Sequence, residues 1–169
     1  MTLVCVRLDR SFSTPRLTAL ADTRASIPRT DGSRKVVSDT TVKLFAIPLR
    51  CYEMDSLTPN IGSWNDPYFE TLIGLGFSGS CFEGLTVVSH LTQSLSALIG
   101  LNGDRPQPCK DGIVHLIAKI TEAYFAAHSG DGEPILRIIA FGFDDARPWV
   151  GNISWDAKNK LSSSPSYSP

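Results

Sequence analysis

The sequence predicts an α+β fold built around a mainly antiparallel sheet. Short apolar runs with strand periodicity come first, two segments with helical periodicity follow, and two more strand-like runs end the pattern. The chain has 169 residues, 42% of them hydrophobic, which is enough for a buried core and is about one domain's length. We therefore expect a single domain over residues 1–157 and a flexible Ser/Pro-rich tail over 158–169.

The N-terminal half predicts four strands. TLVCVRLD and LTALAD flank the loop RSFSTPR and together are typical of a β-hairpin. The polar stretch ASIPRTDGSRKVVSDTT leads to a third strand, KLFAIPL. An irregular segment rich in Pro, Gly, Asn and Asp then separates it from a fourth strand, YFETLIGLGF.

Two amphipathic helices are predicted next. Ser80 and Glu83 fit a capping box, which places the first helix start just after Gly79. Its apolar stripe consists of Cys81, Leu85, Val88, Leu91, Leu95 and Leu98. The second helix carries Ile113, Ile117, Ile120, Tyr124 and Ala127 on one face. The strands ILRIIAFGF and PWVGNISW follow, joined by a turn over residues 144–147.

Composition excludes several classes of protein. Sixteen basic and seventeen acidic residues give a net charge of −1, without the basic excess that nucleic-acid binding requires. Residues 1–48 carry a net +4 and the remainder −5, an asymmetry that we interpret as solvated surface. No run approaches the ~18 apolar residues of a membrane span, and the N-terminus lacks an export signal. We expect a cytoplasmic protein without membrane or nucleic-acid partners.

The cysteines and histidines predict no metal or redox site. Four cysteines are scattered without C-x-x-C spacing, so we expect reduced thiols. The separations of His90, His115 and His128 fit no local metal motif, and the adjacent Asp144 and Asp145 are more typical of a turn than of a catalytic carboxylate pair. We expect neither a metal nor another cofactor.

A G-x-G-x-x-G pattern runs from Gly74 to Gly79, after a predicted strand and before a predicted helix. That context suits a dinucleotide-binding turn, but the second parallel strand ending in an acidic residue is missing. Nucleotide binding is therefore a minor alternative.

Thr2 is the most informative candidate for chemistry. A small second residue permits removal of Met1, which leaves a free α-amine beside the threonine hydroxyl. An α-amine has a reference pKa of about 7.7–8 and can act as general base for that hydroxyl. A lysine opening the third strand, Lys43, would lower the pKa of both groups, and Asp22 after the second strand would hold that lysine charged. An ordinary surface ion pair is the competing interpretation of these two residues.

Five blocks in order resemble the proteasome β-subunits and their bacterial relatives, which are N-terminal nucleophile hydrolases. They are Met-Thr-x-Val-x-Val, Ala-Asp-Thr-Arg-Ala-Ser, Ser-Asp-Thr-Thr-Val-Lys-Leu-Phe-Ala-Ile, Gly-Phe-Ser-Gly-Ser before a helix, and Leu-Arg-Ile-Ile-Ala-Phe-Gly-Phe-Asp. The resemblance implies that Thr2 is the nucleophile, with Asp22 and Lys43 as its charge partners. It also implies that Gly79 donates its backbone N–H to the oxyanion.

The same resemblance assigns substrate contacts. Ser26 would pair its backbone with an extended substrate, and Phe77 and Cys81 would face the specificity pocket. The implied activity is a threonine-type endopeptidase that hydrolyses peptides or unfolded proteins. A catalytically inactive, structural subunit of the same family is the alternative.

The implied fold is an αββα sandwich of two antiparallel sheets, shortened at the C-terminus and therefore incomplete there. The implied partners are copies of the same chain, assembled as a homo-oligomeric ring, and an ATPase that unfolds and feeds the substrate.

Overall fold

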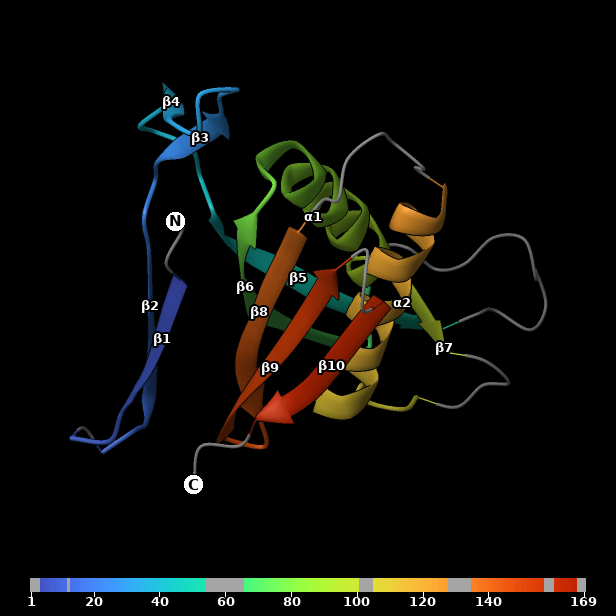
Figure 1. The fold of residues 1–169 in the computed structure, drawn as a ribbon. Coiled ribbons are helices and arrows are strands. Elements are labelled where there is room, and N and C mark those ends of the chain that lie inside the picture. Colours follow the sequence, from blue (N-terminus) through green and yellow to red (C-terminus); the bar gives the residue numbers. More distant parts are fainter. Residues whose placement is uncertain are drawn as a thin grey trace.

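A six-stranded sheet with two helices packed on one face forms the body of the protein (Figure 1). The structure is a computed structural model that describes residues 4–11, 13–53, 66–100, 105–127, 135–156 and 160–166. The strand order is β10-β9-β8-β6-β5-β7. These are β5 (Leu44–Glu53), β6 (Phe69–Gly79), β7 (Leu98–Gly100), β8 (Ile135–Asp144), β9 (Arg147–Asp156) and β10 (Lys160–Ser166). All neighbours are antiparallel except β5 and β7, so the predicted α+β class with a mainly antiparallel sheet is confirmed.

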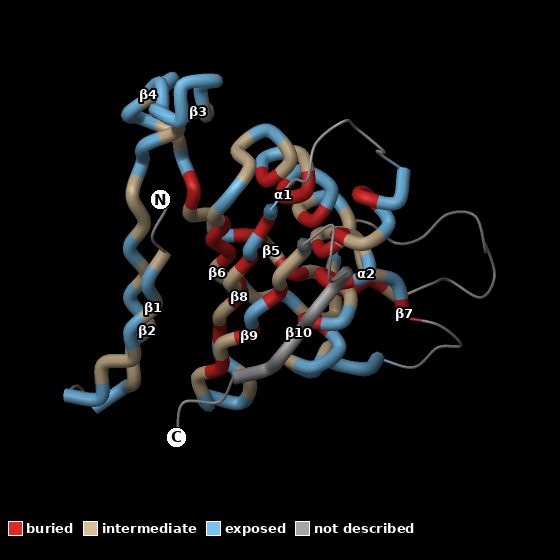
Figure 2. Tube along the Cα trace, in the orientation of Figure 1, coloured by how far each residue is buried: buried red, intermediate tan, exposed pale blue. Residues whose placement is uncertain are grey.

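The two helices are α1 (Cys81–Leu95) and α2 (Lys110–Ala127). Alternate residues of the central strands and the inner faces of both helices form one buried cluster, which lies between sheet and helices (Figure 2). The predicted helix stripes are only partly correct, because Leu85 is 41% exposed and Ala127 is exposed. Gly84 of α1 permits a close approach, because a Cβ at that position would lie 2.4 Å from the ring of Phe77. No described helix combines the length and the apolar character needed to span a bilayer.

A two-stranded ribbon, β1 (Val4–Asp9) and β2 (Arg16–Ala21), approaches the opposite face of the sheet. Val4 packs over Gly76, where an added Cβ would lie only 2.7 Å from a Val4 methyl group. Among the described residues, this ribbon is the second layer, and helices cover a single face of the main sheet. The arrangement supports α+β, whereas the αββα sandwich stays a proposal.

A second hairpin, β3 (Ala25–Pro28) and β4 (Arg34–Ser38), projects beyond the body (Figure 1). We call residues 24–39 the arm. Its base is closed by the Thr41 N–H, which donates to the Thr23 carbonyl at 2.9 Å, and by the Thr23 hydroxyl, which donates to the Asp39 carbonyl at 2.5 Å.

The structure differs from the sequence predictions at several elements. Residues 160–166, expected within a flexible tail, form the edge strand β10, because backbone pairing with β9 needs no apolar side chains and an edge tolerates Pro165. Leu98, assigned to the first helix, lies in β7, since α1 ends at Leu95. The arm strands arise from a stretch that we expected to be a polar loop. The predicted turn at 144–147 is confirmed, with φ of 46° at Asp145 and 63° at Ala146.

Candidate active site

Lys43 is a buried lysine directly before β5. It is only 4% exposed, which is rare for this residue type unless its charge is compensated. Its Nζ donates to the Asp22 carboxylate at 2.6 Å and to the Arg24 carbonyl at 2.5 Å. The Asp22 side chain is 34% exposed, so the ammonium of this ion pair is buried while the carboxylate also contacts solvent. The predicted pairing of Asp22 with Lys43 is present.

The elements around this pair fix it in space. Asp22 directly follows β2, and Arg24 directly precedes β3. The Arg24 side chain donates to Asp39 at 2.8 Å across the base of the arm, which holds the Arg24 carbonyl beside Lys43. Sequence reasoning missed this carbonyl, because backbone acceptors leave no signal in residue identity.

The first described residue of the chain lies beside the same pair. Val4 of β1 is the ladder partner of Ala21, the residue before Asp22. Thr2, the predicted nucleophile, lies outside the described residues. What the structure brings together is therefore the start of β1, the end of β2 and the beginning of β5.

Gly79 ends β6 on the Lys43 side of the sheet. The Phe77 N–H donates to the Lys43 carbonyl at 3.1 Å, so the N–H of Gly79, two residues on, points to the same side of β6. Gly79 has φ of +107°, and a Cβ there would lie 1.9 Å from the Ile135 backbone oxygen. Only glycine fits this backbone.

The α1 N-terminus follows Gly79 immediately. Ser80 is the N-cap residue, so the predicted helix start is confirmed. The Ser80 hydroxyl donates to the Glu83 carboxylate instead of capping a backbone N–H, so the reciprocal capping box does not form. The Ser80 N–H donates to the Ile135 carbonyl at 2.9 Å, which ties the Gly79–Ser80 peptide to the neighbouring strand.

The predicted substrate-contact residues do not form one pocket. Phe77 is 1% exposed and belongs to the core, where its ring lies 6.2 Å from the Phe45 ring. It therefore does not line an open specificity pocket, because its strand face is the one covered by α1. Cys81 is half-buried in the first turn of α1, and half-buried Ser26 lies in β3 of the arm.

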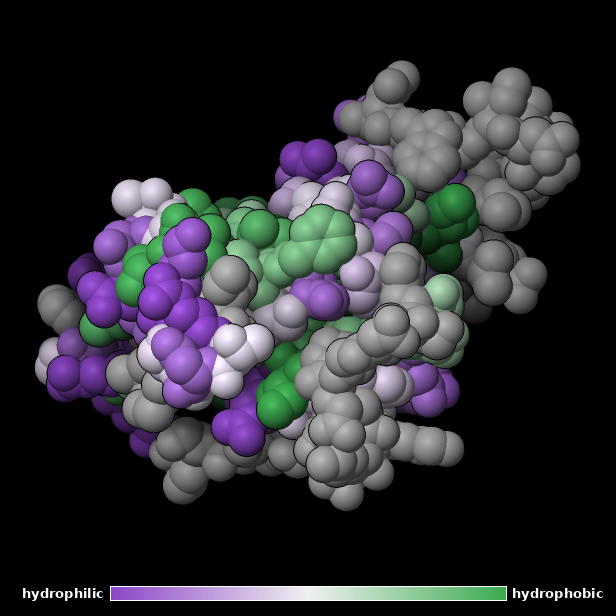
Figure 3. Space-filling model, turned by 45° about the horizontal axis from the view of Figure 1, so that its top comes forward, coloured by the Kyte–Doolittle hydropathy of each residue, from purple (hydrophilic) through white to green (hydrophobic). Residues whose placement is uncertain are grey.

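Exposed apolar side chains surround the Gly79 end of the sheet instead. Val42 is 59% exposed and precedes Lys43, Phe82 is 74% exposed in the first turn of α1, and Ile135 is 52% exposed beside Gly79. Figure 3, with the top of Figure 1 turned forward, shows apolar patches among hydrophilic surface on this side of the molecule. Sequence reasoning missed these residues, since their exposure depends on where the sheet and α1 end.

The other sequence patterns have structural explanations. Gly74 and Gly76 lie inside β6, where an added Cβ would lie 2.1 Å from the Phe141 ring or 2.7 Å from Val4. The G-x-G-x-x-G pattern is thus mostly strand and forms no phosphate-binding loop. All four cysteines are free thiols, and the described residues contain no His, Cys, Asp or Glu group that would hold a metal ion.

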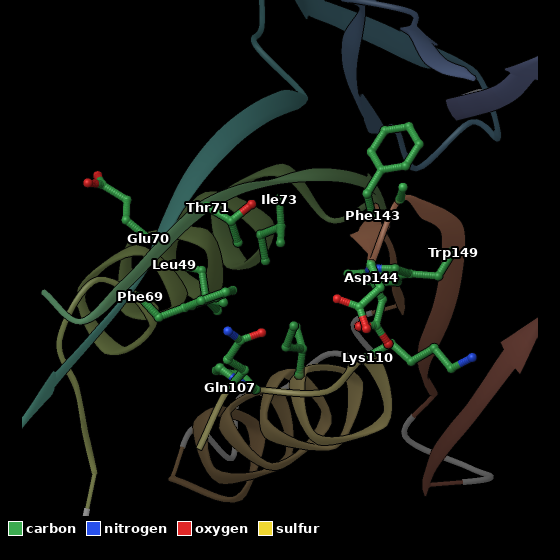
Figure 4. Close-up of a pocket in the computed structure, with 14 residues that line it drawn as sticks. Leu49, Phe69, Glu70, Thr71, Ile73, Gln107, Lys110, Phe143, Asp144 and Trp149 are labelled. Atoms are coloured by element: carbon green, nitrogen blue, oxygen red, sulfur yellow. The ribbon is translucent and has the colours of Figure 1, made fainter. Parts of the chain in front are cut away.

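A separate cavity of about 270 Å³ lies at the far end of the sheet, between the start of α2 and the β8–β9 turn (Figure 4). Its floor is apolar and buried, and its wall includes carboxylates of the turn. Sequence patterns do not indicate this cavity, because its lining residues come from four separate stretches of the chain.

Comparisons with known proteins add no assignment. No family model, no curated protein and no solved structure matches this chain.

Proposed function

We propose that the protein is a proteasome-like threonine peptidase that hydrolyses peptide bonds through Thr2 after removal of Met1. The observation that carries the proposal is the buried Lys43 ammonium, held by Asp22 and by the Arg24 carbonyl beside the start of β1. Thr2 precedes Val4 by two residues, and two residues of chain span at most about 7 Å. The proposal requires the nucleophile, which lies outside the described residues, to reach the charge pair from Val4.

The chemistry follows from these groups. The Thr2 amine takes the proton of its own hydroxyl, and Oγ1 attacks the scissile carbonyl to form a tetrahedral oxyanion. The Lys43 charge favours the ionised oxygen, and the Gly79 N–H, aimed to the same side of β6, donates to the oxyanion. The protonated Thr2 amine then gives this proton to the leaving amine of the substrate, and the acyl group stays on Oγ1 as an ester. Water hydrolyses that ester and releases the acyl group as a carboxylic acid.

The substrate class follows from the surroundings of Gly79. Val42, Phe82 and Ile135 present exposed apolar surface there, which favours substrates with an apolar side chain beside the scissile bond. Peptides and unfolded proteins expose such side chains. We also propose cytoplasmic self-assembly into rings and delivery of substrates by an unfolding ATPase, both on the resemblance alone.

The test is covalent labelling by a peptide with a threonine-reactive electrophile, read by intact mass. The wild-type chain should lack Met1 and gain one adduct, and Thr2→Ala should gain none. Lys43→Met should react at least about tenfold more slowly, because the nucleophile loses its neighbouring charge. Arg50→Met is the matched control: it removes a half-exposed cation of β5 that pairs with Glu70, away from the site, and should react as wild type.

A non-catalytic subunit of the same kind is the second candidate. The Lys43 pair also joins the end of β2 to the beginning of β5, a connection that an inactive subunit would need for stability. An unlabelled wild-type chain that still assembles would favour this candidate.

A further inference from the structure

The charge asymmetry of the sequence corresponds to a separation in space. The described residues up to 48 carry a net charge of +4 and include the ribbon β1–β2 and the arm. The described residues from 49 onward include most of the body and carry seven basic and nine acidic residues, a net charge of −2. Figure 1 shows the ribbon and the arm at the periphery of the sheet and helices. Two copies of such a chain attract each other when the basic part of one meets the acidic part of the other.

The arm presents both charge and apolar surface to solvent. Arg29, Arg34 and Lys35 are exposed, and so are Val36 at 43% and Val37 at 61%. A two-stranded hairpin with both faces in water is marginally stable on its own. Contact with another surface would cover the valines and add to its stability.

The cavity at the other end of the sheet has the complementary character. Leu49, Ile73 and Trp149 contribute to its buried floor, and Asp144 and Asp145 form part of one wall. In Figure 4 the Gln107 amide and the Asp144 carboxylate face the space between α2 and the strands. Glu70 points away from that space, and so does the Lys110 amine. The volume of about 270 Å³ equals roughly nine water molecules, which is room for one long side chain.

The arm and the cavity lie at opposite ends of β6. The arm joins the body beside Lys43, whose carbonyl pairs with Phe77, whereas the cavity includes Thr71. Six residues of strand separate those two positions, or about 20 Å. The contact must therefore form between molecules.

We propose that the arm of one copy docks on the next copy and places the side chain of Arg34 or Lys35 against Asp144 and Asp145 in this cavity. Such a contact is head-to-tail, and repeated contacts form a closed ring if the rotation closes. The proposed function includes self-assembly, but this contact is argued from charge and exposure alone and stands apart from the chemistry of Thr2.

The experiment is analytical ultracentrifugation of the full chain with charge-reversed variants. Arg34→Glu with Lys35→Glu reverses the charge of the arm, and Asp144→Lys with Asp145→Asn reverses the charge of the cavity wall. Asn is chosen at position 145 because it tolerates the φ of 46° found there. Wild type should assemble, and each variant alone should associate about tenfold more weakly or worse. Equal mixing of the two variants should restore assembly, because opposite charges meet again at both contacts. Arg10→Glu, an exposed reversal in the β1–β2 loop, is the control that should assemble as wild type.

The mixture also controls for folding, since misfolded variants cannot rescue each other. A wild-type chain that stays monomeric overturns the inference. Assembly that survives both reversals, or that the mixture fails to restore, also overturns this contact, yet leaves the peptidase proposal and its labelling test intact.

Discussion

Asp22→Asn should destabilise the protein more than Lys43→Met, although both changes break the same ion pair. The reason is the unequal burial of the partners: the Lys43 side chain is 3% exposed and that of Asp22 is 34% exposed. Removal of the carboxylate leaves an ammonium in the interior, whereas removal of the ammonium leaves a carboxylate that water can reach.

The magnitudes follow from this difference. Loss of one partner from a buried ion pair costs about 3–5 kcal/mol, and Asn retains an acceptor oxygen, so we expect about 3 kcal/mol for Asp22→Asn. Met fills the volume of the lysine stem, and the remaining carboxylate is partly solvated, so Lys43→Met should cost about 1 kcal/mol. The double variant should be about as stable as Lys43→Met, because it contains no uncompensated buried charge.

Urea unfolding at pH 7 measures the free energy of unfolding of each variant. The Arg50–Glu70 pair is the matched control, since its side chains are 42% and 50% exposed and either neutral substitution should cost no more than about 1 kcal/mol. A Lys43→Met variant that loses as much stability as Asp22→Asn would refute the reasoning.

Four further outcomes are expected. Gly79→Ala should lower the free energy of unfolding by about 3 kcal/mol or more, because its φ is +107° and a Cβ would meet a backbone oxygen at 1.9 Å. Gly112→Ala, whose nearest neighbour is a sulfur at 3.5 Å, should instead gain about 0.5–1 kcal/mol in α2, and denaturant unfolding of the two variants tests this. Iodoacetamide at pH 8 should modify exposed Cys109 well before Cys51, because burial raises the pKa of the Cys51 thiol; equal rates in peptide mass spectrometry would contradict this. The pKa of Asp31 should lie below its ordinary 3.8, because the serine two residues on donates its hydroxyl and N–H to the carboxylate. Its stabilising contribution is then present above pH 3.8 and lost as the pH falls through the folded pKa, and an NMR titration midpoint at or above 3.8 would be inconsistent with that bond.

Periodicity predicted the body of the fold because burial leaves a pattern in the sequence. The strand around Ile47 is buried on one side and shows alternating apolar residues in the sequence. Within the predicted helix stripe, Val88, Leu91 and Leu95 are buried and follow three-and-four spacing. β10 ends in SSSPS, four serines and one proline, and pairs with β9 through its backbone, which hydrophobic periodicity cannot detect. Most of β4 in the arm is exposed, so this strand also lacks a pattern of buried residues.

The candidate site was predictable in part. Residue type and block order identified Asp22, Lys43 and Gly79, and the structure adds the Arg24 carbonyl and the direction of the Gly79 N–H. The family resemblance implied that Phe77 faces the specificity pocket. Phe77 lies on the same face of β6 as Leu75, two residues earlier, and both side chains are buried. Which face of β6 is buried follows from its pairing with β5 and cannot be read from the motif.

The most direct test of the central claim is the mass of the purified chain before and after reaction with a threonine-reactive peptide electrophile. Our account predicts a chain without Met1 and a single adduct that peptide mapping locates on Thr2. A chain that retains Met1, or an adduct that persists in Thr2→Ala, would contradict it.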